Sequence, residues 1–116
     1  MNWRLPTKKE LNDMYKNLHK KRVGSFANDI YWSSSECGDH IAWSQAFMYG
    51  NQYLNYKRNY YLWVRAVRTF QSDKKYQIGD KTETGIIFYV DGNIYKECKF
   101  KDENVYNWNQ AMKLFE

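Results

Sequence analysis

Two mainly apolar segments, residues 41–48 and 60–70, flank a polar stretch rich in Tyr and Asn in the middle of the chain. The second segment alternates in part between apolar and basic residues, as expected of a strand with two different faces. Gly50 and Asn51 follow the first segment, and both residue types tolerate the positive φ of tight turns. The pattern predicts two antiparallel strands joined by a long, exposed loop, residues 49–61.

Helical periodicity marks both ends of the chain. Thr7 and Glu10 have the spacing of a capping box, in which each side chain accepts a hydrogen bond from the other residue's backbone N–H. A helix from residue 8 to about residue 21 is predicted, with an apolar face made of Leu11, Met14, Tyr15 and Leu18. A second, shorter amphipathic helix is predicted from Trp108, Ala111, Met112 and Phe115.

Further strands are predicted on either side of these segments. Residues 85–90 read as a buried strand, and Asp91-Gly92 is a strong signal for a two-residue hairpin leading into a strand over residues 93–100. A short strand is also predicted at Tyr31-Trp32. Ser33–Ser35 should leave it in a turn, because adjacent hydroxyls compete for backbone hydrogen bonds.

The length of the chain indicates one small domain, residues 1–116, and the predicted helices and strands make it an α+β domain. Aromatic residues make up 19% of the chain, enough to fill a core and leave a spare aromatic surface. No apolar run approaches the roughly 18 residues of a membrane span. The first residues, MNWRLPTKKEL, lack the apolar stretch of a signal peptide.

Charge is unevenly distributed along the chain. Residues 1–70 hold 11 Lys and Arg against 5 Asp and Glu, whereas residues 71–116 hold 7 against 8. A basic surface suits sulfated glycans, nucleic acid or acidic proteins, although many of these lysines would simply solvate the first helix. Cys37 and Cys98 are compatible with one disulfide or with two free thiols, and no Cys/His cluster has metal-ligand spacing.

Three sets of residues occur in the order and spacing of one family. They are Trp3-Arg4-Leu5-Pro6-Thr7 with Glu10-Leu11, Tyr31-Trp32-Ser33-Ser34-Ser35-Glu36 with Ala42-Trp43 and Phe47, and Val64-Arg65-Ala66-Val67-Arg68 with Phe70. They resemble the C-terminal domain family of the collagen-like adhesin Lcl and its bacterial and phage relatives. The resemblance implies a C-type lectin-like fold, related to formylglycine-generating-enzyme-like and phage variable receptor-binding domains, with two helices packed on small antiparallel sheets.

The order of the motifs is rotated relative to that family. Residues 85–116 resemble its N-terminal part, residues 1–70 resemble its C-terminal part, and residues 71–84 would be a linker. Either the chain is a circular permutant that closes on itself, or its opening half complements a neighbouring copy in a tandem array or a swap. We favour the permutant, because joining adjacent termini through a surface loop costs little.

The sequence argues against an enzyme. His40 follows Asp39 near Cys37 and three serines, but sequence neighbours rarely have the geometry of a catalytic triad. The copper-binding cysteine pair that the formylglycine-generating resemblance would require is missing. So are the Glu-Pro-Asn and Trp-Asn-Asp motifs of calcium-dependent lectins. We therefore expect no catalytic residue, metal or cofactor.

The Tyr- and Asn-rich loop is either a polar connector or a binding site, in which Tyr would give rigid amphipathic contact area and Asn and Gly would adapt to a partner. The resemblance favours a binding site, because the relatives display ligands at this end of the fold. Its proposed ligand-binding residues are Tyr49, Asn51, Gln52, Tyr53, Asn55, Tyr56, Lys57, Arg58, Asn59 and Tyr60. Structural roles are expected for Trp3, Trp32, Trp43, Phe47, Trp63, Arg65, Arg68 and Trp108. One of the two arginines could pair with Glu36.

The leading interpretation is a non-enzymatic ligand-binding or adhesion module that recognises a glycan, sulfated in one version, or a protein surface. The alternative is a structural subunit of a phage tail or cell-surface array, with halves complemented between copies. Nucleic-acid binding ranks third. The resemblance favours a place outside the cell or on a phage particle.

Overall fold

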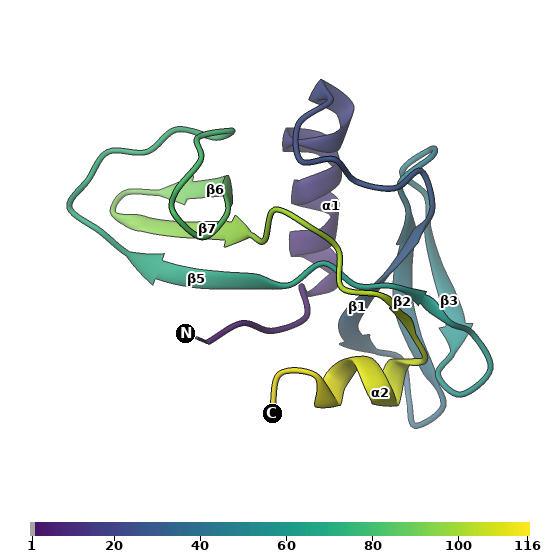
Figure 1. The fold of residues 1–116 in the computed structure, drawn as a ribbon. Helices are drawn as coiled ribbons and strands as arrows, with labels where there is room; N and C mark the ends of the chain where they lie inside the picture. The colour runs from purple at the N-terminus through teal and green to yellow at the C-terminus, as the bar shows by residue number, and fades with distance from the viewer. Residues whose placement is uncertain (1) are drawn as a thin grey trace.

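The structure is a computed structural model that describes residues 2–116, and it is a small α+β domain with two α-helices, as the sequence predicted (Figure 1). The elements are α1 (Lys8–Asn17), the 3₁₀-helix η1 (His19–Lys21), β1 (Ile30–Glu36), β2 (Ile41–Ala46), β3 (Gln52–Tyr56), β4 (Leu62–Trp63), β5 (Val67–Gln71), β6 (Ile86–Asp91), β7 (Ile94–Cys98), β8 (Val105–Tyr106) and α2 (Trp108–Lys113).

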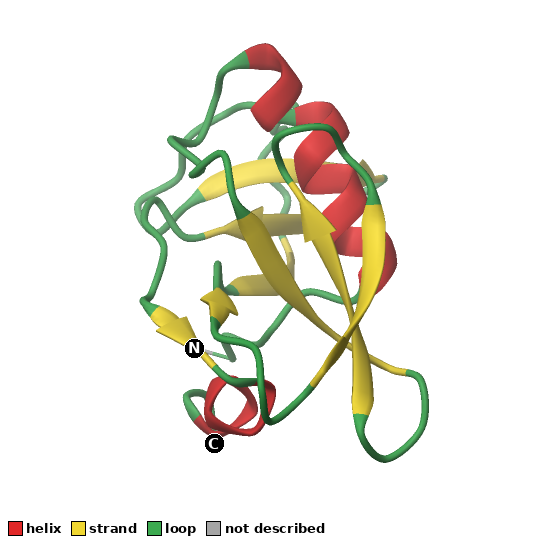
Figure 2. Ribbon diagram, turned by 90° about the vertical axis from the view of Figure 1, so that its right-hand side faces the viewer, coloured by secondary structure: helices red, strands yellow, loops and turns green. Residues whose placement is uncertain are grey.

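The strands form two separate sheets. A five-stranded sheet has the order β3-β2-β1-β4-β8, and a three-stranded sheet has the order β5-β7-β6. All neighbouring strands are antiparallel except β1 and β4, which pair in parallel. Figures 1 and 2 show α1 standing between the two sheets, where it contacts β1, β2 and β6.

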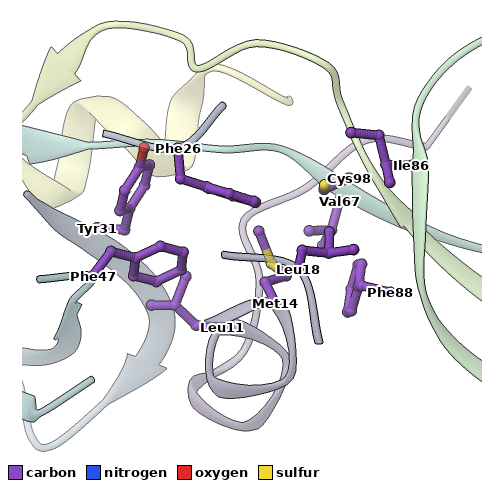
Figure 3. Packing of buried hydrophobic residues seen from close by; sticks show 10 residues of the cluster. All are labelled: Leu11, Met14, Leu18, Phe26, Tyr31, Phe47, Val67, Ile86, Phe88 and Cys98. Carbon is purple, nitrogen blue, oxygen red and sulfur yellow. The ribbon is translucent and has the colours of Figure 1, made fainter. Parts of the chain in front are cut away.

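The first helix begins and buries its apolar face as predicted. Thr7 and Glu10 form both hydrogen bonds of the capping box, and the α-helix ends at Asn17 before η1 tightens the final turn. Its apolar face packs against rings from β1 and the segment after β2, and against side chains of the three-stranded sheet (Figure 3). This core cluster contains Leu11, Met14, Leu18, Phe26, Tyr31, Phe47, Val67, Ile86, Phe88 and Cys98.

The two helices lie on opposite faces of the five-stranded sheet. Tyr31 belongs to the cluster around α1, whereas its neighbour Trp32 belongs to a second cluster with Trp108 and Ala111 of α2. Successive residues of a strand point to opposite faces, so β1 separates the two clusters. Trp108 Nε1 also donates to Ser33 O at 2.9 Å, which fixes α2 against β1.

The prediction that residues 41–48 and 60–70 pair as a central hairpin is wrong. Residues 41–46 pair with β3, which lies inside the expected loop, and not with residues 60–70. Gly50, with φ of +88°, makes the turn that starts β3. The later segment splits instead: β4 pairs with β1 and β5 pairs with β7 in the other sheet.

The serine run is also misplaced by the sequence analysis, because Ser33–Ser35 lie within β1. The register of β1 against β2 shifts between Trp32 and Glu36, as at a β-bulge. The hydroxyls still bond backbone groups: Ser33 Oγ donates to Trp43 O at 2.7 Å, and Ser35 Oγ accepts from Lys8 N at 2.9 Å. The bulge therefore anchors the start of α1.

The C-terminal hairpin is confirmed, but its two-residue loop lies one residue later than the predicted Asp91-Gly92. Asp91 pairs with Ile94, so the two-residue loop is Gly92-Asn93, and Gly92 takes a φ of +59°. Residues 72–85 connect β5 to β6 without a regular strand or helix, and they pack against the three-stranded sheet. Tyr76 packs on Phe70 and Tyr95 in this segment.

Candidate binding surface

Residues 48–61 carry an unusual share of the exposed apolar surface. Seven of the thirteen exposed large hydrophobic side chains in the described part of the chain come from this stretch. They are Met48, Tyr49, Tyr53, Leu54, Tyr56, Tyr60 and Tyr61, here called the β3 surface. Tyr49 is 80% exposed and Tyr56 is 56% exposed. Large exposed patches of this kind mark interaction sites more often than single exposed residues do.

The side chains of β3 point to both faces of the sheet. Leu54 pairs with Trp43, whose ring lies under Lys8 Nζ at 3.5 Å, so Leu54 faces the α1 side. Tyr53 pairs with Ser44 and lies on the opposite face. The aromatic residues therefore wrap around an edge and do not form one flat platform.

The outer edge of β3 has no strand beside it. Ala46 N donates to Asn51 O and Lys57 N to His40 O, which sets the alternation of the β2–β3 ladder. Alternation then directs the backbone groups of Gln52, Leu54 and Tyr56 outward. No other described strand pairs on that side, since β3 is terminal in its sheet.

The predicted site residues do not gather at one place. Tyr49 and Asn51 lie in the turn before β3, whereas Arg58, Asn59 and Tyr60 lie in the turn after it. At about 3.4 Å per residue the two turns are separated by roughly 15 Å of strand. A small ligand could contact only one of them.

Two polar side chains of β3 that were proposed to bind a ligand already form hydrogen bonds within the domain. Gln52 Nε2 donates to Lys8 O at 2.9 Å and so ties β3 to the start of α1. Asn55 Oδ1 accepts a short hydrogen bond from the hydroxyl of Ser44. Their positions follow from the pairing of β2 and β3, which the sequence analysis missed.

A cavity of about 390 Å³ opens at the second turn, and we call it the His40 cavity. The residues that line it come from four segments: the β1–β2 turn, the end of β3, the turn after β3, and α2. Its lining consists of Asp39, His40, Tyr56, Lys57, Arg58, Asn59 and Asn109. Four of these were among the proposed ligand-binding residues, whereas Asp39, His40 and Asn109 come from segments that only the tertiary fold brings together.

Lys57 is a support of this cavity and not a free ligand-binding cation. It is 4% exposed, and its Nζ donates to Glu36 Oε1 at 2.6 Å and to Gly38 O and Asp39 O at 3.2 and 3.1 Å. These three bonds use all the donors of an ammonium group. The ammonium also lies 4.3 Å from the centre of the Trp108 ring. Arg58, the next residue, is exposed and has no ion pair among the described residues.

Glu36 therefore pairs with Lys57 and not with either arginine considered for it. Arg65 is fully buried, and its Nε lies 2.6 Å from Asp102 Oδ1. Arg68 Nε lies 2.6 Å from Glu97 Oε2, a carboxylate that also accepts from Thr82 and Thr84. Arg65 thus connects the segment between β4 and β5 to the segment after β7, and Arg68 connects β5 to β7. No local motif in the sequence indicates either ion pair.

The aromatic residues expected to be structural differ in burial. Trp32, Phe47 and Trp108 are buried in the two clusters. Trp43 and Trp63 are partly exposed, and Trp63 Nε1 donates to Asp29 Oδ2 at 3.2 Å. Trp3 is also partly exposed, with the Arg68 guanidinium 5.6 Å from its ring centre.

Several ionisable groups are perturbed by the fold. Although burial raises it, hydrogen bonds from Arg4 and Lys96 lower the pKa of Glu10 to about 2. Burial, together with hydrogen bonding to Asp102, raises the pKa of Tyr31. Burial also raises the pKa of the Cys98 thiol to about 11, and Cys98 forms no disulfide with the exposed Cys37. None of these groups belongs to the β3 surface.

Comparison with known proteins gave no match to a family model, to a curated protein or to a solved structure. Over residues 2–116, no three His, Cys, Asp or Glu side chains are grouped so as to hold a metal ion. None of the helices described is long and apolar enough to cross a membrane. The class that fold and surface define is a small α+β domain with an exposed aromatic strand edge.

Proposed function

We propose that this domain is a non-enzymatic binding module of adhesin or receptor-recognition type. The concentration of exposed Tyr side chains on and around β3 is the observation that carries the proposal. Tyr side chains lose little entropy on binding and offer both a ring and a hydroxyl, so they suit glycan and protein surfaces alike. The ligand is a glycan, with sulfated glycans favoured by the basic half of the chain, or a protein surface.

The end of the β3 surface beside the His40 cavity is the stronger part of this site. It offers an exposed ring from Tyr56, a free guanidinium from Arg58 and amides from Asn59 and Asn109 around one concave space. The ion pair with Glu36 and the contact with the Trp108 ring fix the position of Lys57, which lines this cavity. Rigid support beneath polar groups is what small binding sites require.

We also infer that the fold is C-type lectin-like and circularly permuted. Leu5, near the N-terminus, belongs to the same core cluster as Trp108 and Ala111, with Phe115 packed against it. Residues Trp3–Leu5 and the end of α2 also line one shallow cavity of about 320 Å³. Adjacent chain ends are what a permuted arrangement needs.

A glycan array probed with the wild-type domain is the first test, and it supplies the ligand for the second. The double variant Tyr56→Ala/Arg58→Gln should then weaken binding to that ligand by at least about tenfold, as central Tyr and Arg contacts do. Lys101→Gln, an exposed charge change on the opposite half of the chain, is the matched control. If the double variant and the control bind with equal affinity, the binding site does not lie on the β3 surface.

The free edge of β3 favours one alternative, an assembly subunit that pairs with another copy. The β6 edge is covered by residues 79–81, β5 begins against Arg4, and β8 has only two residues. β3 has five residues, no charged side chain and no cover. Natural proteins usually protect such edges. A mass from light scattering that stays monomeric up to millimolar concentration would exclude this alternative.

A further inference from the structure

A second cavity, which we call the His19 cavity, opens beside η1 near the other end of the β2–β3 hairpin. Its volume is about 430 Å³, within the range of roughly 300–1,000 Å³ typical of small-molecule sites. None of the residues of the His40 cavity contributes to it. Only Met48 belongs to the β3 surface, so the two sites can be tested separately.

Aromatic rings form one side of this cavity. Tyr15, His19, Phe26 and Phe47 all line it, and their rings pack against one another, two pairs edge to face and three pairs tilted. The His19 and Phe26 ring centres are 5.9 Å apart at 79°, and those of Tyr15 and Phe47 are 5.6 Å apart at 71°. Figure 3 shows Phe26 and Phe47 beside Tyr31 at one end of the core. Phe26 is 8% exposed and Phe47 is 1% exposed, so a further ring entering the cavity would contact this cluster mainly through the partly exposed Tyr15 and His19.

Unpaired cations lie at the rim. Lys20 and Arg22 both line the cavity and are exposed, and neither forms an ion pair among the described residues. The lining contains no carboxylate. A ligand with one anionic group would therefore meet two positive charges without a competing acid.

The backbone around the rim is strained and firmly held. Arg22 and Ser25, with φ of +60° and +52°, are the non-glycine residues with positive φ in residues 2–116. Such conformations are energetically unfavourable for non-glycine residues and persist only where the surroundings enforce them. Here the buried Arg65 donates to Gly24 O at 2.9 Å and to Ser25 O at 3.2 Å. The loop is thus set in place before any ligand arrives.

We propose that the His19 cavity binds a small aromatic anion, a planar ring that carries a carboxylate or a phosphate. The ring packs against the aromatic side and the anion pairs with Lys20 and Arg22. A sugar fits less well, since its hydroxyls need several acceptors. Besides the Tyr15 hydroxyl and the His19 ring, the lining offers only Ser25 and Asn28 as polar side chains without a formal charge, and Asn28 Oδ1 already lies 2.9 Å from His19 Nε2.

The test is a titration of the intact domain followed by NMR, with phenyl phosphate and 4-hydroxyphenylacetate as the probes. Phenol supplies the ring alone, inorganic phosphate the anion alone, and glucose 6-phosphate an anion on a sugar ring. Both probes should saturate, and phenyl phosphate should bind at least about tenfold more tightly than each of the three comparison compounds. No saturable binding, or inorganic phosphate or glucose 6-phosphate binding as tightly as phenyl phosphate, would overturn the proposal.

Charge variants then locate the site. Lys20→Gln/Arg22→Asn should weaken phenyl phosphate binding by about tenfold or more, and Asn is chosen because it tolerates positive φ. Lys113→Gln, which removes one positive charge on α2 as Lys20→Gln does beside the cavity, should leave affinity unchanged. If the double variant unfolds, Lys20→Gln alone should still weaken binding severalfold. Equal affinities of Lys20→Gln and Lys113→Gln would refute the assignment, whatever the β3 surface binds.

Discussion

At the scale of single residues, buried ion pairs connect parts of this chain that are far apart in the sequence. Each of three ion pairs connects the first seventy residues to residues after the linker segment, and the pairs are Glu10–Lys96, Arg65–Asp102 and Arg68–Glu97. A buried charge is costly unless it is paired and hydrogen-bonded. The two parts of the chain therefore depend on each other for stability, although no sequence motif announces these partners.

Glu10 should make the free energy of unfolding decrease as the pH falls below about 4.5. Its pKa is lowered to about 2 in the folded state, so its stabilising contribution is complete above the unfolded-state pKa of about 4.5. That contribution is lost as pH falls toward 2, and it amounts to about 3 kcal/mol. Urea unfolding from pH 6 to pH 2 should show this loss in the wild type.

The matched variant for that measurement is Glu10→Gln, which keeps the capping box because Gln can accept the same hydrogen bond from Thr7 N. The difference in unfolding free energy between wild type and variant should shrink by about 3 kcal/mol between pH 5 and pH 2. A difference that stays constant over this range would mean that the Arg4 and Lys96 contacts do not stabilise the carboxylate.

Arg65 should be far more important for stability than Arg58. Arg65→Met would leave Asp102 without its cation inside the protein and release the carbonyls of Gly24 and Ser25. A loss of about 3–5 kcal/mol is expected. Arg58→Met, at an exposed position, should change the unfolding free energy by no more than about 0.5 kcal/mol. Denaturant titration at neutral pH compares the two, and similar losses would contradict the buried network.

At the scale of elements, the edge position of β3 can be tested by proline substitution. The backbone N–H of Leu54 points outward and that of Tyr53 points to β2. Leu54→Pro should therefore cost less than about 1 kcal/mol, since proline is tolerated where no ladder bond is lost. Tyr53→Pro should cost about 2 kcal/mol or more, because it removes a ladder donor. Denaturant unfolding of the two variants measures the difference.

The opposite ranking would mean that the register of the β2–β3 hairpin is wrong. Leu54→Pro also removes the outward donor that a second copy would use. If the wild type self-associates in light scattering and Leu54→Pro does not, the β3 edge is the interface. If both associate equally, another surface is responsible.

Elements with strong local signals were predictable from the sequence, and β3 was not. The capping box of α1 and the Asp-Gly signal of the second hairpin each fix a structure within a few residues. β3 has exposed side chains on both faces, so its residues, QYLNY, lack the period-2 contrast that identifies a half-buried strand. Its pairing with β2 depends instead on Gly50 and on amide bonds to α1.

The candidate site was predictable only as a composition. The tyrosines between residues 49 and 60 are exposed, yet the sequence could not separate Lys57 from Arg58, which have the same charge and adjacent positions. Burial of Lys57 depends on Glu36 and Trp108, which arrive from a different strand and from α2. Local patterns cannot report such contacts, because they arise from tertiary packing.

The whole molecule is one unit built from both parts of the chain. The core cluster around α1 includes Leu11 and Met14 together with Ile86 and Phe88, and the second cluster brings Leu5 next to Trp108. The N- and C-terminal ends lie near each other in Figure 1, on the same side of the molecule. A chain with this geometry can be closed and reopened elsewhere without disturbing either cluster.

That geometry gives a direct test of the proposed permutation. Joining Glu116 to Asn2 through a short Gly/Ser linker and opening the chain between Asp73 and Lys74 would restore the motif order of the family that the sequence resembles. Both residues are exposed in the segment between β5 and β6, and closing a loop costs only slightly more as it lengthens. The rearranged protein should be a folded monomer within about 2 kcal/mol of the original in urea. Opening the chain instead between Ala42 and Trp43, inside β2, should prevent folding. If the Asp73–Lys74 permutant folds only as a dimer, the two halves exchange between copies and the assembly alternative gains support.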